Sequence, residues 1–345
     1  MPVPRILAVA TATPPHYYPQ SRLAELAKEL AGFTDAQRLG FFTHSDIEGR
    51  YLYWEPEQIR TDESVDQLND RFVRGALELG KSASLRCLER AGWSPRDVDF
   101  LATTTCTGRL CPSLDAHLIG ELGCRPDIQR VHVGDTGCAS AMVALQQACN
   151  HLQAFPGHRA LVLAVEICSA AIYLDDRLES AVATAIFADG AGALALGTEG
   201  DGVNILAHRT LFRSEHLSAM GFTYPGGRPR VILSKDVRRI GAAMMREMVE
   251  TLLACQGLKR EHMRAWVLHS AGRRVIEQAQ KLIGLGDADV AHSRAVLRRF
   301  GNMSSATVLF VLDELIRTAP PCPGDWGVMI ALGPGFAAEG ALLRW

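Results

Sequence analysis

The sequence predicts an α/β fold made of two similar halves, chiefly because its pattern repeats. Three kinds of segment recur after 165 residues: a helix end with a turn and a strand, a helix start, and a buried strand. The pairs are 91–102 and 256–267, 137–145 and 302–310, and 161–165 and 326–330. An offset shared by three pairs indicates an internal repeat. Identity between the pairs is negligible, so a coincidental alternation of strands and helices stays open as the alternative.

The strands of this pattern are predicted to be buried on both faces. Residues 160–165 are continuously apolar, as in sheets that helices cover on both sides. Helical segments alternate with such strands, which is typical of α/β proteins. The apolar run at 6–10 is too short for a signal peptide, and we interpret it as the first strand. The charged, glycine-containing stretch 198–202 predicts a seam between halves 1–200 and 201–345.

The composition excludes several classes of function. The chain has 36 basic and 38 acidic side chains and a net charge of −2, whereas proteins that grip a phosphate backbone carry a positive excess. We therefore expect no nucleic acid partner. No apolar run approaches the roughly 20 residues of a membrane span. The nine cysteines include no CxxC pair and no zinc-type spacing, which favours reduced thiols in a cytoplasmic protein without a metal.

Cys138 lies where a helix is expected to begin. The small residues around it, in the segment 134–141, leave room for a substrate, and apolar helix-forming residues follow. Unpaired backbone N–H groups at a helix start favour an anion such as a thiolate. We interpret Cys138 as a nucleophile, with a buried structural cysteine as the alternative.

Two polar residues occupy comparable junctions in the second half. His269 ends the apolar strand 265–268 and opens a glycine turn, and Asn302 precedes a helix. Alone, each is more simply a structural histidine or a helix N-cap. By the repeat, however, Cys138 and Asn302 are one residue apart in equivalent elements, so their helix starts should face each other. His269 and Asn302 can then donate two hydrogen bonds to one thioester oxygen, forming an oxyanion hole.

Two other uses of Cys, His and Asn are alternatives to this interpretation. A papain-like cysteine hydrolase uses the same three residue types, but its local cysteine signature is absent and the two-half pattern does not suit it. A non-catalytic binding subunit of the same fold would have lost the nucleophile, whereas Cys138 is present.

In these motifs the chain resembles the type III polyketide synthases, the chalcone and stilbene synthase-like enzymes among the thiolase-like ketosynthases. The segments that carry the resemblance are 5–15, 136–140, 187–190, 301–315 and 333–335. The resemblance implies a thiolase-like, five-layered αβαβα fold and a homodimer. It also implies Claisen condensation of acyl thioesters carried on coenzyme A or on an acyl carrier protein, with no bound cofactor.

The resemblance also implies a role for each matching residue. Cys138 accepts the acyl group, while His269 and Asn302 bind the thioester oxygen and promote decarboxylation of a malonyl-type extender. His269 further helps to hold Cys138 as a thiolate. The substrate-binding positions are Phe187 and Val231 as gatekeepers, Cys106, Thr107, Cys168, Ser304, Gly333 and Pro334 around the cavity, and Cys111 reaching across the dimer.

Several positions depart from the plant-type pattern. Val231 replaces a phenylalanine, which predicts a wider cavity, and Cys106 and Cys168 replace threonines; small-residue packing is the alternative for the cysteines. In the stretch that grips coenzyme A phosphates, only Arg38 is firmly cationic, beside His44. At the turn after His269 we expect Gly272, Arg273 and Arg274 near a phosphopantetheine phosphate, with solvated surface arginines as the alternative.

These departures open a narrower alternative. Some type III-like ketosynthases take chains from acyl carrier proteins and join two β-ketoacyl chains into an α-pyrone. A wide cavity and a weak coenzyme A site would suit that reaction. A ketoacyl-carrier-protein synthase III-like enzyme is a further alternative, because the turn after His269 partly matches that group. Starter, extender and cyclisation mode depend on the cavity and are not readable from the sequence.

Overall fold

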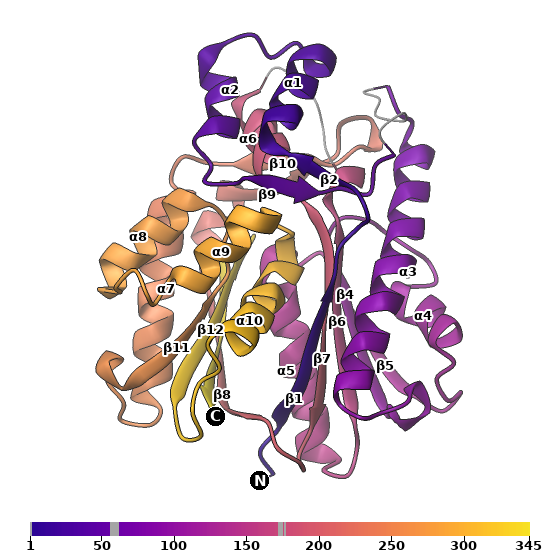
Figure 1. Ribbon diagram of the computed structural model, residues 1–345, viewed down its shortest axis with the longest axis vertical. Coiled ribbons are helices and arrows are strands. Elements are labelled where there is room, and N and C mark those ends of the chain that lie inside the picture. The colour runs from indigo at the N-terminus through magenta and orange to yellow at the C-terminus, as the bar shows by residue number, and fades with distance from the viewer. Residues whose placement is uncertain (1, 56–61, 172–174, 176) are drawn as a thin grey trace.

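The computed structural model describes residues 2–55, 62–171, 175 and 177–345 (Figure 1). One sheet of nine strands runs through the molecule in the order β11-β12-β13-β8-β1-β7-β6-β4-β5. Its strands are β1 Arg5–Ala12, β4 Phe100–Thr105, β5 Gln129–Gly134, β6 Ala160–Ile167, β7 Asp189–Gly197, β8 Val203–Phe212, β11 Met263–Leu268, β12 Trp326–Gly333 and β13 Ala337–Arg344. The helices are α1 Gln20–Ala31, α2 Ala36–Thr43, α3 Val65–Arg90, α4 Leu114–Leu122, α5 Ser140–Ala154, α6 Leu178–Ile186, α7 Val237–Ala254, α8 Arg273–Ile283, α9 Ala291–Phe300 and α10 Thr307–Thr318.

The sheet consists of two half-sheets that share a narrow seam. Strands β1 and β8 pair only at Arg5 with Asn204 and at Ile6 with Val203. On one side, β4 and β6 are parallel and β7 and β1 follow antiparallel; on the other, β11 and β12 are parallel and β13 and β8 follow antiparallel. The recurring segments of the sequence are thus equivalent strands and helices, and the prediction of two similar α/β halves is confirmed. The seam at residue 200 stays a prediction, because the sheet is continuous across it.

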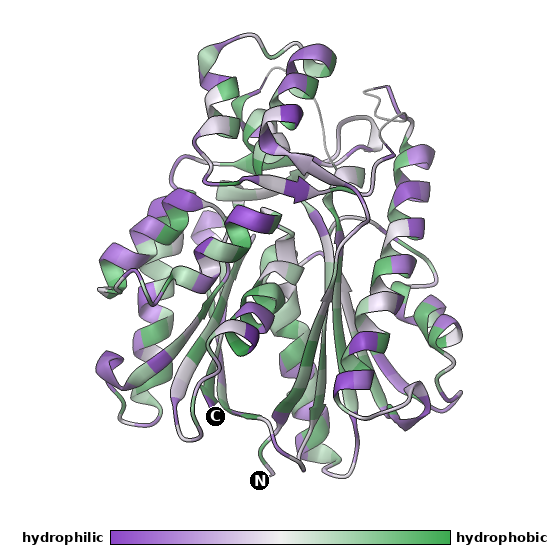
Figure 2. Cartoon of the chain, in the orientation of Figure 1, coloured by the Kyte–Doolittle hydropathy of each residue, from purple (hydrophilic) through white to green (hydrophobic). Residues whose placement is uncertain are grey.

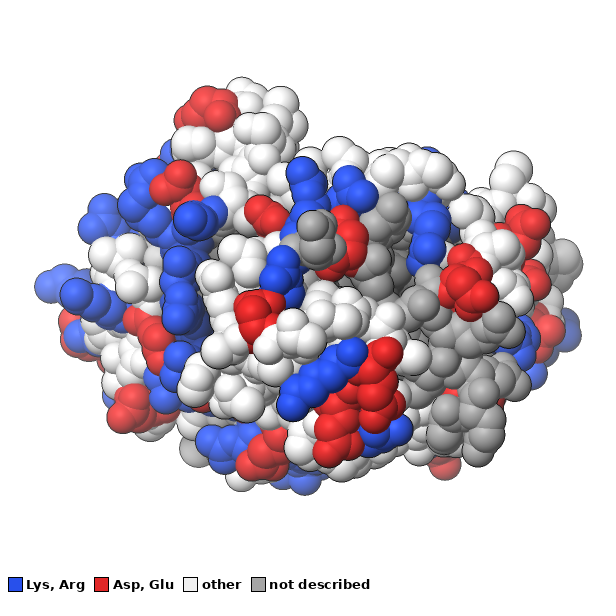
Figure 3. Space-filling model, turned by 90° about the horizontal axis from the view of Figure 1, so that it is seen from above, with Lys and Arg blue, Asp and Glu red and all other residues white. Residues whose placement is uncertain are grey.

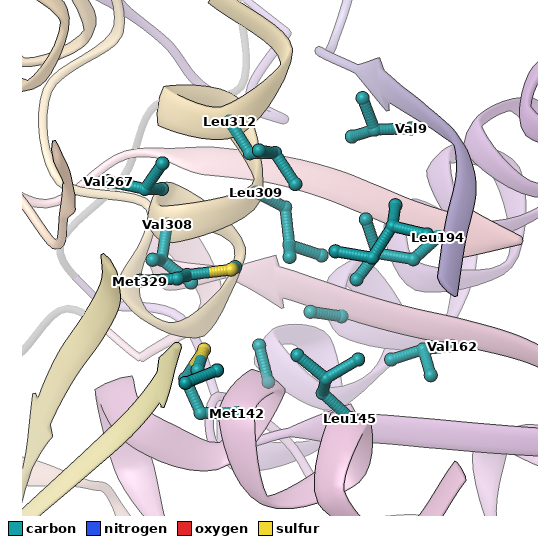
Figure 4. Close-up of a cluster of buried hydrophobic side chains, with 14 of the residues drawn as sticks. Val9, Met142, Leu145, Val162, Leu194, Val267, Val308, Leu309, Leu312 and Met329 are labelled. Atoms are coloured by element: carbon teal, nitrogen blue, oxygen red, sulfur yellow. The ribbon is translucent and has the colours of Figure 1, made fainter. Parts of the chain in front are cut away.

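Helices form three layers around the two half-sheets. Helices α5 and α10 lie between the half-sheets, α3 and α4 cover one outer face, and α7 and α8 cover the other (Figure 1). The arrangement is the five-layered αβαβα fold expected from the resemblance. Apolar side chains of α5, α10 and both half-sheets meet in the central layer, where Met142, Val162, Leu309 and Met329 are fully buried (Figure 4).

Burial explains why so many strands are apolar throughout. Every residue of β4, β6 and β7 is buried, and apart from the threonines of β4, Glu166 of β6 and Asp189 of β7 these residues are apolar or glycine. The strands are accordingly coloured mostly as hydrophobic (Figure 2). The outer helices α3 and α7 instead carry polar residues on their outward sides (Figure 2). Among the described residues, none of the helices is long and apolar enough to cross a membrane.

A cap of short elements covers one end of the sheet. It contains α1, α2, α6 and two antiparallel pairs of short strands, β2 Tyr17–Pro19 with β3 Gly49–Tyr51, and β9 Met220–Thr223 with β10 Arg230–Leu233 (Figure 1). The two chain ends lie at the opposite end of the molecule (Figure 1). The candidate catalytic residues lie at the cap end, where β11 ends and where α5 and α10 begin.

Candidate active site

Cys138 lies in a tight turn that leads directly into α5. Residues Gly137–Ala139 form a single 3-10 turn before the helix. Gly137 has a φ of 62°, and a Cβ on it would lie 2.2 Å from Cδ of Pro334. A Cβ on Gly333 would lie 2.8 Å from the Thr136 carbonyl oxygen. The Gly333–Pro334 loop therefore packs flush against the nucleophile turn, and only glycine fits at both contacts.

The start of α10 faces the start of α5, as the repeat predicted. The Sγ atom of Cys138 lies 3.3 Å from the Ser304 Oγ. Ser304 belongs to the 3-10 turn Ser304–Ala306 that precedes α10, and its φ of 48° is unusual for a residue with a side chain. The two helix starts thus bring half-buried Cys138 together with the buried Asn302–Ser304 corner in one site.

Asn302 is held in one orientation by the backbone around it. Its Oδ1 accepts hydrogen bonds from the Ser304 N–H at 2.9 Å and the Thr307 hydroxyl at 3.3 Å, and its Nδ2 donates to the Ala271 carbonyl at 3.2 Å. The oxygen end is thereby occupied, so the free N–H of the amide is the group left to meet a ligand. Asn302 is not the N-cap of α10, a position that Ala306 takes.

His269 is buried and its ring makes no hydrogen bond to any of the described residues. It is 1% exposed, and both Nδ1 and Nε2 lack a partner there. Burial lowers the pKa of His269 to about 4, so the imidazole is neutral at physiological pH. A neutral, unpartnered imidazole keeps one N–H donor and one acceptor for a substrate or for the thiol.

The protonation state of Cys138 differs from the sequence expectation. A helix start and His269 were expected to hold it as a thiolate. Burial instead raises the pKa of Cys138 to about 11, and no hydrogen bond links the thiol to His269 among the described residues. Desolvation disfavours the anion by more than the helix start stabilises it. With these pKa values, the Cys138 thiol and the His269 imidazole are both neutral at pH 7.

Glu166 is a buried carboxyl group that the sequence analysis missed. It lies on β6 and is fully buried. Its oxygens accept hydrogen bonds from the Cys106 N–H at 3.1 Å, the Thr107 hydroxyl at 2.9 Å and the Ser305 hydroxyl at 2.5 Å. Burial raises the pKa of Glu166. The signal was present in the sequence, as a lone acidic residue in an otherwise apolar strand.

Cys106 joins Glu166 to the nucleophile. Its Sγ lies 3.4 Å from Glu166 Oε1 and 3.1 Å from the Ser304 Oγ, which also contacts Cys138. Burial raises the pKa values of Cys106 and Cys168 well above that of an ordinary cysteine. The structure thus gathers the expected cavity residues Cys106, Thr107 and Ser304 in one network around Glu166, and Cys168, which is buried, lies close enough to contribute to the raised pKa of Cys106.

The two expected gatekeepers come from neighbouring elements. Phe187 ends α6 and forms an isolated parallel bridge with Asn302, and α6 packs against β10, which carries Val231. Val231 is half-buried and pairs with Phe222 across the β9–β10 hairpin. Cys111 is exposed on the loop that follows β4.

The residues expected to meet phosphopantetheine are partly engaged elsewhere. Arg38 contacts the Asp35 carboxylate at 2.5 Å, and His44 ends α2. Arg273 lies 3.9 Å from Asp46 and 3.8 Å from Glu277, while Arg274, after Gly272 at the start of α8, is exposed without an ion pair among the described residues. Seen from the cap end, Lys and Arg side chains gather on the side of α7, α8 and α9 (Figure 3).

Comparison with known families identifies the chain. Residues 215–345 match the family of chalcone and stilbene synthases, C-terminal domain, and residues 80–255 match FAE1/type III polyketide synthase-like proteins. A 3,5-dihydroxyphenylacetyl-CoA synthase of Streptomyces toyocaensis is 34% identical over all of this chain and 90% of its own. The chain belongs to the type III polyketide synthases. It is a ketosynthase of the acyltransferase class, and its reaction is a Claisen condensation.

Other relatives of this polyketide synthase make different products. A 1,3,6,8-tetrahydroxynaphthalene synthase of Streptomyces peucetius subsp. caesius is 33% identical, over 99% of this chain and 93% of its own. The alpha-pyrone synthesis polyketide synthase-like Pks18 of Mycobacterium tuberculosis is 30% identical, over 98% and 90%. The crystal structure of PKS-I from the brown alga Ectocarpus siliculosus superposes with a TM-score of 0.92 at 28% identity, covering 100% of this chain and 99% of the other.

Proposed function

We propose that this enzyme extends an acyl chain held on Cys138, with His269 and Asn302 stabilising the charge that develops on thioester oxygens. The observation that carries the proposal is the state of two side chains. His269 is a buried neutral imidazole without a hydrogen-bond partner among the described residues, and the oxygen end of the Asn302 amide is occupied. Donors that are already oriented and desolvated are the groups that stabilise an oxyanion most strongly.

Loading begins with a proton transfer. His269 accepts the proton of the Cys138 thiol as the sulfur attacks the thioester carbonyl, because a thiol with a pKa of about 11 needs a base at neutral pH. The tetrahedral oxygen accepts hydrogen bonds in the site, and the carbon–sulfur bond to the carrier breaks. The departing thiolate takes the proton from His269, which leaves an acyl group on Cys138 and a neutral imidazole.

Extension uses the same two donors. A malonyl-type thioester loses CO₂, and the electron pair of the broken carbon–carbon bond forms an enolate whose oxygen faces His269 and Asn302. The enolate carbon attacks the acyl carbonyl on Cys138 and expels the thiolate, so the product is two carbons longer and stays on its carrier. No electron is gained or lost overall, so no redox partner is needed.

The gate and cavity residues set how far the chain grows. In the proposal, Phe187 and Val231 form a gate on the cap side of the site, and the residues around the reacting carbon are Cys106, Thr107, Cys168, Ser304, Gly333 and Pro334. A valine in place of a large aromatic leaves more room for a growing or branched chain. Three relatives at 30–34% identity carry names of three different products, so product identity does not transfer from them.

Substrate delivery from an acyl carrier protein is a second proposal, beside delivery as coenzyme A thioesters. The engagement of Arg38 by Asp35 favours it, since a guanidinium already paired at 2.5 Å is a weaker site for a free phosphate. Exposed Arg274 and the Lys and Arg side chains that gather on the side of α7, α8 and α9 suit an acidic partner (Figure 3). Free cysteines throughout the described chain fit a cytoplasmic enzyme.

We also propose a homodimer. Strand β5 is the last strand of the sheet, and its side chains are exposed or half-buried. An edge strand of this kind offers unpaired backbone groups to a second copy. Cys111, on the loop that precedes α4, would then reach toward the partner's site. Light scattering after gel filtration measures the assembly, and a monomer at micromolar concentration would contradict the proposal.

Intact-protein mass spectrometry tests the nucleophile and the mode of delivery together. Wild type, Cys138→Ala and the control Cys255→Ala, which removes an exposed thiol, are each incubated with matched acyl-coenzyme A and acyl carrier-protein thioesters. We expect an acyl adduct on wild type and Cys255→Ala and none on Cys138→Ala. An undiminished adduct on Cys138→Ala refutes the nucleophile. An adduct from coenzyme A alone refutes carrier-protein delivery.

A further inference from the structure

Arg50 is a fully buried cation next to the active site. It lies on β3 in the cap and is 1% exposed. No carboxylate forms an ion pair with it among the described residues. Arginine is almost never fully buried unless it is paired. Burial lowers the pKa of Arg50 only to about 9, so it stays charged at neutral pH.

The partners of Arg50 are at the carboxyl end of α6. Its Nη1 donates to the Phe187 carbonyl at 2.5 Å and its Nε donates to Gln20 Oε1 at 3.1 Å. Gln20 in turn donates from Nε2 to the Ala185 carbonyl at 2.7 Å. The last carbonyls of a helix lack partners within it and carry partial negative charge, so a buried cation is stabilised there. Arg50 and Gln20 together cap α6 at the gatekeeper Phe187.

The stem of Arg50 also lies against the residue before Asn302. A Cβ on Gly301 would be 2.8 Å from both Cγ and Cδ of Arg50, and the φ of Gly301 is 74°. The segments on either side are tied to each other, since the Asn302 N–H donates to the Ile186 carbonyl at 2.9 Å and the Ala188 N–H donates to the Asn302 carbonyl at 2.8 Å. Arg50 therefore contacts both sides of the bridge that carries Phe187 and Asn302.

We propose that Arg50 is a positioning residue that aligns the Asn302 amide with the thioester oxygen and holds the Phe187 gate, by clamping these two segments from the cap. The inference rests on the proposed roles of Asn302 and Phe187. Even buried ion pairs can often be replaced by hydrophobic residues of similar volume without loss of stability, so burial alone does not explain an arginine at this position. The planar fork of guanidinium donors reaches the end of α6, and the aliphatic stem packs on Gly301, so one side chain contacts both segments at once.

The clamp also connects the substrate entrance to the reacting centre. Gln20 begins α1, and its backbone N–H donates to the Glu48 carbonyl in the loop between α2 and β3. Arg38 and His44, expected at the phosphopantetheine, belong to α2 and its end. A shift of this part of the cap upon substrate binding would therefore reach Asn302 through Gln20 and Arg50.

The test compares Arg50→Met and Arg50→Lys with the control Arg71→Met. Arg71 is also a buried arginine, but it bonds the Ser169 carbonyl and Glu63 and not the Phe187–Asn302 bridge. Two rates are measured. One is alkylation of Cys138 by iodoacetamide, followed by mass spectrometry of the peptide that carries Cys138, because other thiols of the chain are exposed. The other is CO₂ release from malonyl-coenzyme A, which uses Asn302 in the proposed function. We expect Arg50→Met to slow CO₂ release at least about tenfold, since small misplacements at a reacting centre cost up to about a hundredfold. Alkylation should stay within about twofold, because the thiol itself is not displaced.

A double mutant separates positioning from general damage. If Arg50 acts through Asn302, Arg50→Met adds no further loss of CO₂ release to Asn302→Ala. The proposal is overturned if the double mutant loses CO₂ release by the product of the two single-mutant losses. It is also overturned if alkylation and CO₂ release fall equally in Arg50→Met and in Arg71→Met. Arg50→Lys keeps the charge with one compact head group, and we expect its rate of CO₂ release to lie between those of wild type and Arg50→Met. If Arg50→Met does not fold, the same comparisons are made with Arg50→Lys, and a wild-type rate of CO₂ release in that variant contradicts the proposal. If Asn302→Ala itself leaves CO₂ release unchanged, the proposed function fails, whatever Arg50 does.

Discussion

Substituting Gly137 by alanine tests how tightly the loop at Pro334 fixes the nucleophile turn. Gly137 has a φ of 62°, and a Cβ on it would lie 2.2 Å from Cδ and 2.6 Å from Cγ of Pro334. A left-handed conformation costs a non-glycine residue about 1–2 kcal/mol, and overpacking adds about 1–3 kcal/mol. We therefore expect Gly137→Ala to lower the free energy of unfolding by about 2–5 kcal/mol.

Gly257→Ala is the matched control for the backbone part of this cost. Gly257 has the same φ of 62°, and nothing lies within 4 Å of a Cβ on it. Its substitution should therefore cost only the conformational part, about 1–2 kcal/mol. Urea unfolding of wild type and both variants at one protein concentration measures the two losses.

The difference between the two variants isolates the contact with Pro334. Acylation of Cys138 should also fall in Gly137→Ala, because the new methyl group displaces either Pro334 or the nucleophile turn, while Gly257→Ala should acylate at the wild-type rate. If the free energy of unfolding falls by the same amount in both variants, to within about 0.5 kcal/mol, the Pro334 loop accommodates the methyl group without loss of stability. That result refutes the reasoning.

Three further predictions concern buried acids and the gate. Glu166→Ala should destabilise the fold by about 1–3 kcal/mol more than Glu166→Gln, as judged by urea unfolding, because it leaves several buried donors without an acceptor. Burial raises the pKa of Asp189 to about 6 from 3.8. Between pH 4 and pH 6 the folded state therefore binds more protons at Asp189 than the unfolded state does. Asp189 contributes stability that is present below pH 4 and is lost as the pH rises through 6. Asp189→Asn should remove about 3 kcal/mol of this pH dependence, visible in unfolding curves from pH 4 to 7. Val231→Phe should narrow the gate and shorten the longest product seen by liquid chromatography and mass spectrometry, with Val231→Ala as the control that should not.

Much of the fold could be predicted because its signal is periodic. The apolar run at 160–165 and its counterpart at 326–330 are β6 and β12, and burial on both faces is why neither strand alternates. The joining of the half-sheets at only two residue pairs of β1 and β8 was not predictable, since pairing partners far apart in sequence leave no local pattern. The cap's short strands were likewise missed, because three or four residues carry too little pattern.

The candidate site followed from the same repeat, but its electrostatics did not. Equivalent helix starts predicted that Cys138 and the Asn302 corner would face each other, and Ser304 lies 3.3 Å from the thiol. The thiolate expectation relied on the helix start and ignored desolvation, which depends on burial and so on the finished fold. Arg50 is a similar case: an arginine in a short polar segment reads as exposed, whereas the cap encloses it completely.

The two half-sheets share only two residue pairs of β1 and β8, so the two halves are held together mainly by their helices. Helix α10 of the second half packs against β1 and β7 of the first, while α5 of the first half packs against β12 and β13 of the second. Each half therefore completes the other's interior. A gene cut at residue 200 would yield two chains that aggregate apart and assemble only together, as an obligate heterodimer.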